Sequence, residues 1–168
     1  MTQQLTLSAL VKNRAGVLLR VAGLFARRGY NISSLTVCQT EDESFSRMTI
    51  VAQAQPEDFG QIEQQLLKLE DVVRVLHLDS GHTVSSELLL IKVHALNRDR
   101  PDTIRVVTEF GARIKDIGHR TITAELTGET QQIDEFVDAM SRFGIAEMSR
   151  TGIAALESGD VNIKGETF

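Results

Sequence analysis

The chain has 168 residues, of which 42% are hydrophobic, with a formal net charge of -5 at pH 7 and one cysteine, Cys38. This length allows one domain or two small ones whose cores need no disulfide, and a lone cysteine fits a reducing, cytoplasmic setting. The acidic balance, with scattered lysine and arginine, argues against nucleic-acid binding, and the N-terminal residues have neither the order of a signal peptide nor the length of a membrane span.

The first half of the chain alternates strand and helix patterns. Apolar residues occupy every second position of LTLSALV, which predicts a half-buried strand over 5–11. Apolar residues then recur at helical spacing from Gly16 to Arg28, and Gly29 follows as a left-handed cap. Two β-branched segments flank the polar turn TEDESF and predict a hairpin. The other expected elements are strands 31–39 and 46–54, a helix 56–69 and a strand 71–79.

The second half repeats this order after the small, polar stretch SGHTVSS, which is expected to be a linker. Its expected elements are a strand 87–95, a helix 101–110, hairpin strands 113–118 and 120–128, a helix 131–143 and a strand 145–156. The sequence therefore predicts an α+β fold with two tandem ferredoxin-like domains of β-α-β-β-α-β order. The predicted boundaries are a first domain 1–79, a linker 80–86, a second domain 87–156 and a flexible tail 157–168.

Each predicted sheet has helices on one face only. The strands nevertheless carry apolar residues at both alternations, as at Val72 and Val73. The second faces and the sheet edges therefore need cover, and pairing with another copy of the chain is the usual remedy. We expect at least a homodimer.

No catalytic or metal-binding constellation appears in the sequence. The four histidines show no metal-ligand spacing among themselves or with Cys38, and no nucleophile-elbow or phosphate-loop motif is present. Cys38 lies on a predicted strand, so we interpret it as a small core residue. The expectation is a chain without catalytic residues, metal or cofactor of its own.

The most informative local feature is the loop KNRAGVL, where the first strand passes into the first helix. The first amides of a helix lack internal partners and can bind an anion, and Gly16 would let a ligand approach them closely. Asn31 could hold the ammonium of an amino acid, with Val17, Leu18 and Ile32 as apolar walls. The alternatives are that Gly16 only eases a tight turn and that Asn31 is an ordinary turn residue.

Four stretches of the chain closely resemble the regulatory small subunit of acetolactate synthase, also called acetohydroxyacid synthase. These stretches are NRAGVLLRVAGLFARRGYNISSLTV (13–37), SRMTI (46–50), ELLLIKV (87–93) and SRTGIAAL (149–156). The resemblance runs from about residue 4 to 156, and GLFARRGYNISSLTV is its most specific part.

This resemblance implies an ACT domain in the first half and a second ferredoxin-like domain. It also implies a non-catalytic homodimer that activates a large catalytic subunit and makes it sensitive to branched-chain amino acids, above all valine. Thiamine diphosphate, Mg²⁺ and FAD would belong to that large subunit. In this family the effector lies between two ACT domains. The matching positions are Asn13, Gly16, Val17 and Leu18 from one protomer, with Asn31 and Ile32 from the other.

Two other functions share part of this pattern. An acylphosphatase-like hydrolase shares the β-α-β-β-α-β order and superficially fits Arg14 and Asn31, but the glycine-rich loop of that family is missing. An amino-acid-responsive transcription regulator would need a DNA-reading element, and no helix-turn-helix pattern precedes or follows the two halves.

Overall fold

The computed structural model describes residues 2–166, with only the backbone described at Ser80. The chain forms two compact units, one made of residues up to Ser85 together with those from Ile153 onward, and the other of Ser86–Gly152. Within the described residues, no helix is both long and apolar enough to cross a membrane.

The first unit contains a four-stranded antiparallel sheet in the order β2-β3-β1-β4. Its strands are β1 (Gln3–Lys12), β2 (Asn31–Gln39), β3 (Phe45–Ala54) and β4 (Val72–His77). Helix α1 (Val17–Arg28) follows β1, and a 3₁₀ turn (Pro56–Asp58) leads into α2 (Phe59–Leu67) before β4. The predicted β-α-β-β-α-β order is thus confirmed, although the second helix is shorter than expected because its first turn is 3₁₀.

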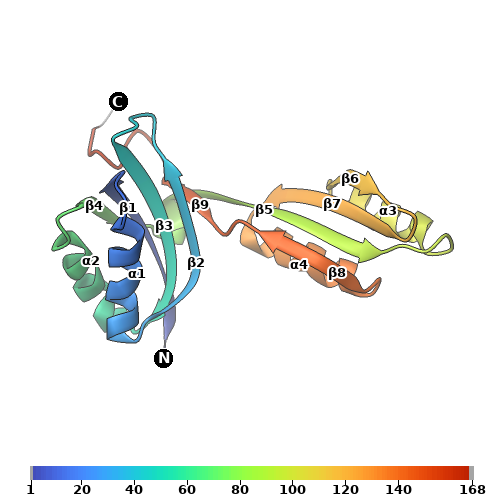
Figure 1. Ribbon diagram of the computed structural model, residues 1–168, viewed down its shortest axis with the longest axis horizontal. Coiled ribbons are helices and arrows are strands. Elements are labelled where there is room, and N and C mark those ends of the chain that lie inside the picture. The colour runs from blue at the N-terminus through green and yellow to red at the C-terminus, as the bar shows by residue number, and fades with distance from the viewer. Residues whose placement is uncertain (1, 167–168) are drawn as a thin grey trace. The chain divides into compact units, whose positions relative to one another are not determined.

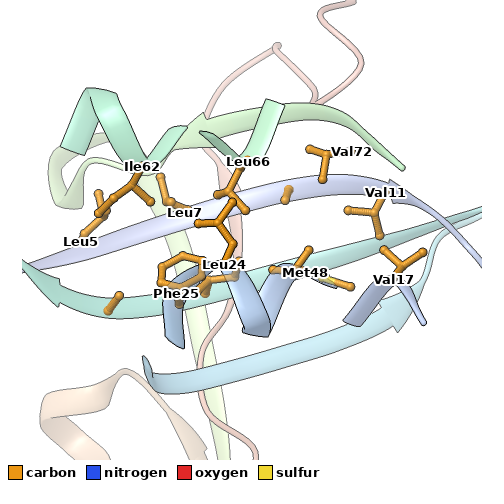
Figure 2. Close-up of a cluster of buried hydrophobic side chains, with 14 of the residues drawn as sticks. Leu5, Leu7, Val11, Val17, Leu24, Phe25, Met48, Ile62, Leu66 and Val72 are labelled. Carbon is orange, nitrogen blue, oxygen red and sulfur yellow. The ribbon is translucent and has the colours of Figure 1, made fainter. Parts of the chain in front are cut away.

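Both helices of the first unit cover the same face of its sheet (Figure 1). Every second residue of β1, from Leu5 to Val11, points into this core. The core residues that Figure 2 labels are Leu5, Leu7, Val11, Val17, Leu24, Phe25, Met48, Ile62, Leu66 and Val72. Burial of these side chains is what holds α1, and therefore the loop before it, in a fixed place.

The opposite face of this sheet is covered in part by the chain itself. Ser8, Leu10, Thr49 and Val51 alternate with the core residues along β1 and β3, and all four are buried. The Arg47 guanidinium on the same face donates to Ser8 Oγ at 3.3 Å and to the Ala155 carbonyl at 3.4 Å. Ala155 belongs to a short strand, β9 (Ala154–Glu157), which pairs with β5. A second copy is therefore not needed to cover this part of the sheet.

The structure differs from the expected linker and tail. Residues 80–86 form a 3₁₀ turn (Ser80–His82) and the start of β5 (Thr83–His94), because Thr83 Oγ1 donates to the Asp79 carbonyl and β9 supplies a strand partner. In the expected tail 157–168, Ile163 is only 5% exposed and Lys164 pairs with Glu41 at 2.7 Å. The tail is therefore anchored on the first unit at Ile163 and Lys164, and residues 167–168 lie outside the described range.

The second unit repeats the same architecture, with strand order β6-β7-β5-β8. After β5 its elements are α3 (Arg100–Glu109), β6 (Arg113–Ile117), β7 (Thr121–Gly128), α4 (Thr130–Ser141) and β8 (Ile145–Arg150). Alternate residues of β5, namely Leu89, Ile91 and Val93, pack with Phe136 of α4 in a core of their own. The α+β class with two ferredoxin-like units is therefore confirmed.

The predicted strand 145–156 is divided into β8 and β9. Gly152 between them has a φ of 79°, which L side chains rarely adopt, so the chain turns there before β9 pairs with β5. Just before this turn, Arg150 pairs with the buried Glu87 and, at 2.7 Å, with Asp134 of α4. The hydrogen bond to Glu87 raises the pKa of Arg150 above its ordinary value.

Candidate functional site

The loop between β1 and α1 turns on Gly16, the N-cap of the helix. Gly16 has φ 86° and ψ -8°, a left-handed conformation that costs other residues free energy. A Cβ placed on Gly16 would meet Arg20 Nη1 at 3.8 Å and no other side chain more closely. The backbone angle therefore accounts for the glycine, and the space in front of the helix start is open.

The start of α1 offers unpaired amides to this open space. In the part of the chain that the structure describes, neither the Leu18 nor the Leu19 N–H donates to a backbone carbonyl. The first turn also contains no acidic side chain that would occupy these donors. These two N–H donors and the helix dipole together favour a negatively charged group at the start of α1.

Asn13 connects this loop to the hairpin turn between β2 and β3. Its main-chain N–H donates to the Ser44 carbonyl at 2.7 Å and its side-chain Nδ2 donates to the Glu43 carbonyl at 2.9 Å. In the same turn, a hydrogen bond with Lys164 lowers the pKa of Glu41, and hydrogen bonds with Ser44 lower that of Asp42. One N–H of Asn13 Nδ2 is thus committed to the turn, and the side-chain Oδ1 is the acceptor that it offers to a ligand.

The two apolar residues expected in the site have different surroundings. Val17 is 3% exposed and belongs to the core of the first unit, so only its backbone faces the loop. Leu18 is 46% exposed and Leu19 is 76% exposed, so the apolar surface beside the helix start comes from these two leucines. Leu19 was not among the expected site residues, although its place in the first turn of the helix was visible in the sequence.

Asn31 and Ile32 lie far from Gly16 in the same chain. Lys12, at the loop end of β1, pairs with Phe45, whereas Asn31 pairs with Gln53. Residues 45 and 53 are eight positions apart along β3, which at strand spacing is about 26 Å. Asn31 is exposed at the start of β2, an edge strand, and Ile32 packs against the core. A site that contains both Gly16 and Asn31 therefore requires a second copy of the chain.

An ion pair that the sequence pattern did not indicate stands next to the loop. Arg20 Nη2 lies 2.5 Å from Asp71 Oδ2, and the Asp71 side chain is 11% exposed. The Asp71 carbonyl accepts a hydrogen bond of 2.8 Å from the N–H of Lys12. The sequence held one local sign of this ion pair, namely an arginine one helical turn after Gly16. The pair itself could not be predicted from local spacing, because Asp71 lies 51 positions after Arg20.

Cys38 does not lie where the sequence pattern predicted it. Cys38 is exposed on β2, so its interpretation as a core residue was wrong: β2 is an edge strand, and this position lies near its end. No group of three or more potential metal ligands occurs among the described residues.

The open hollows of the second unit include two that are lined by residues of that unit alone. One, of about 190 Å³, lies on the face of the second sheet opposite its helices and includes Lys92 and Glu147, which pair at 3.2 Å. The other, of about 620 Å³, lies between the loop before α3 and the turn before β7 and includes Arg98 and Arg120. Neither hollow contains any of the expected effector residues.

Comparisons with known proteins assign both halves of the chain to one family. Residues 7–74 match the AHAS small subunit-like ACT domain, and residues 86–159 match the small subunit of acetolactate synthase. The chain is 43% identical over 154 residues to a probable acetolactate synthase small subunit of Methanothermobacter thermautotrophicus, covering 91% of this chain and 92% of that protein. The chain belongs to the acetolactate synthase small subunit family.

Other members of this family support the same assignment. The acetolactate synthase small subunit of Mycobacterium bovis is 42% identical, with 92% of each chain covered. The crystal structure of the acetolactate synthase small subunit from Thermotoga maritima superposes with a TM-score of 0.87 at 35% identity, covering 95% of this chain and 99% of that one. The first unit is thus an ACT domain, and the family is that of a regulatory subunit rather than of a catalytic chain.

Proposed function

We propose that this chain regulates acetolactate synthase by binding its large catalytic subunit, raising the activity of that subunit and making it sensitive to branched-chain amino acids. Valine is the foremost candidate effector. Thiamine diphosphate, Mg²⁺ and FAD belong to the large subunit in this proposal, and the small subunit contributes no catalytic group.

The single observation that carries the effector role is the start of α1. Gly16 leaves space there, and the N–H groups of Leu18 and Leu19 have no backbone acceptor within the described residues. These donors suit the carboxylate of an amino acid, while the exposed Leu18 suits an aliphatic side chain.

The geometry of β3 supports a homodimer as the binding form. Asn31 pairs with one end of β3, and the loop that contains Gly16 begins beside the other end. The side-chain amide that binds the ammonium group must therefore come from a second copy of the chain. Strand β2 is at the edge of its sheet, so it can form main-chain hydrogen bonds with a second copy. Asn31 is the first residue of this strand. In the proposed dimer each effector contacts both protomers, so effector binding and dimer geometry are thermodynamically linked.

Reconstitution with the large subunit tests this function. The purified chain is titrated into its large catalytic subunit, and acetolactate formation from pyruvate is measured with and without valine, leucine and isoleucine. We expect the activity to rise with added chain and to fall again with at least one of these amino acids. Acetolactate formation by the chain alone, or no effect on the large subunit, would contradict the proposal.

A further inference from the structure

We propose that Arg20 binds the carboxylate of the effector, so that a side-chain charge as well as the helix amides selects free amino acids. This inference rests on the proposed function, because it concerns the effector site in the β1–α1 loop. It adds a residue that lies outside the set expected from the sequence.

Arg20 returns from the second turn of α1 toward the start of the helix. Its N–H donates to the Gly16 carbonyl at 3.0 Å, which places it one helical turn after the glycine. Its Nη1 lies 3.8 Å from the position that a Cβ of Gly16 would occupy. The guanidinium therefore lies beside the start of the helix, where Leu18 and Leu19 follow Gly16 in the first turn.

Asp71 holds the guanidinium in this place without using all of its donors. It binds Nη2 through Oδ2 at 2.5 Å, and it is itself held by its carbonyl, which accepts from Lys12. An arginine has five N–H donors, so one edge can pair with Asp71 while another faces a second anion. The Arg20 side chain is 51% exposed, which leaves that edge open to a ligand from solvent.

The charges around the loop determine which end of a zwitterion would lie here. Lys12, Arg14 and Arg20 are cationic, the first turn of α1 contains no acidic side chain, and the neighbouring Asp71 carboxylate is 11% exposed and paired with Arg20, so it offsets one of the three charges. An ammonium group is repelled by these cations, whereas a carboxylate is attracted. The effector therefore binds with its carboxylate toward Arg20 and its ammonium toward the partner protomer, and compounds without a free carboxylate are rejected.

Calorimetric titration of the full-length chain with valine and with valinamide, which lacks the carboxylate, tests this role. Arg20→Ala is expected to weaken valine binding by about 10- to 100-fold, the range for a charge-assisted hydrogen bond. Arg20→Lys keeps the charge but cannot span Asp71 and the ligand together, so a loss of about 3- to 10-fold is expected. The wild-type chain should bind valine far more tightly than valinamide, and Arg20→Ala should reduce this preference.

Arg105→Ala is the matched control, because it removes a half-exposed, ion-paired helical arginine from the second unit, which contains none of the expected effector residues. It should leave the valine affinity within about 2-fold of wild type. Thermal unfolding and sedimentation of each variant report whether the fold and the dimer persist.

The outcomes separate this inference from the proposed function. Valine binding by wild type with unchanged affinity in Arg20→Ala would overturn the role of Arg20 and leave the effector site in place. Equal wild-type affinities for valine and valinamide would overturn it without any variant. Failure of the wild-type chain, alone and with its large subunit, to bind any branched-chain amino acid would overturn both.

Discussion

The side-chain amide of Asn13 donates a 2.9 Å hydrogen bond to the main-chain carbonyl of Glu43. This contact ties the loop before α1 to the turn between β2 and β3, so the helix start is held from two sides. A loop fixed in this way loses little conformational freedom when a ligand binds, which favours affinity. The predictions below test the site and the fold that supports it.

Asn31→Ala is expected to weaken effector binding and to leave the dimer intact. The substitution removes a hydrogen-bonding partner of a charged ligand, a loss of about 1.5 to 3 kcal/mol when the contact is shielded from water. Calorimetry with valine measures the affinity, and Ser33→Ala, a neighbouring exposed position on β2, is the control. Equal affinities of Asn31→Ala and wild type would make Asn31 an ordinary turn residue.

Gly16→Asp is expected to abolish feedback inhibition and largely to spare activation. The new carboxylate would stand where the effector carboxylate must lie, within reach of the Arg20 guanidinium. The positive φ at Gly16 adds strain of about 1 to 2 kcal/mol, partly offset by the favourable interaction of an acidic residue with the helix start. The measurement is acetolactate formation by the reconstituted complex across a valine titration.

A second glycine separates strain from the loss of the site. Gly111 also has a positive φ, of 67°, with open space around its Cβ position, and it lies in the second unit. Gly111→Asp should therefore cost at least as much stability, because this glycine follows the C-terminus of α3, where an acidic residue interacts unfavourably with the helix dipole, and it should keep inhibition by valine. Wild-type inhibition in the Gly16→Asp complex would refute the proposed site, and complete loss of activation would show that this loop also contacts the large subunit.

Ile163→Ala is expected to destabilise the chain by about 2 to 5 kcal/mol, the range for a buried aliphatic side chain. Ile163 is 5% exposed, whereas Val161 in the same segment is 42% exposed. Val161→Ala should therefore change the unfolding free energy by less than about 0.5 kcal/mol. Urea denaturation of both variants compares the two values, and equal small effects would mean that this segment does not pack on the first unit in solution.

The stability of the second unit should fall in acid partly through Glu125. Burial alone would raise the pKa of this carboxyl, but hydrogen bonds and charges from Arg113 and Lys115 outweigh it and set the pKa below the ordinary 4.5. A lowered carboxyl pKa contributes stability above the unfolded-state pKa, and this contribution is lost as the pH falls through the folded value. Glu125→Gln should therefore lose stability at neutral pH and show a shallower decline between about pH 5 and pH 3. An identical pH profile for wild type and variant would contradict this account.

Local patterns were sufficient to predict the order of the elements. Alternating apolar residues on β1 and helical spacing on α1 both report burial against immediate neighbours, and Gly29 ends α1 with a φ of 74° as its position indicated. The return segment could not be predicted in this way. ESGDVNIKGETF is polar and contains glycines, and Ile163 is buried only because the chain comes back to the first unit.

The candidate site was predictable only in part, for the same reason. The position of Gly16 directly before a helical pattern was enough to predict the loop. Pairing of Arg20 with Asp71 and the exposure of Cys38 depend on which strands lie side by side, a long-range property that no local spacing contains. Sequence reasoning therefore found the loop and missed the ion pair beside it.

The first unit is discontinuous in sequence, since it contains residues up to Ser85 and again from Ile153. Synthesis on the ribosome proceeds from the N-terminus, and domains generally fold as units as they emerge. The second unit, Ser86–Gly152, is continuous and can thus complete its fold before the strand β9 has been made. The domain that begins the chain is accordingly the last to be finished, because the Ala155 carbonyl that accepts from Arg47 and the buried Ile163 are made only then.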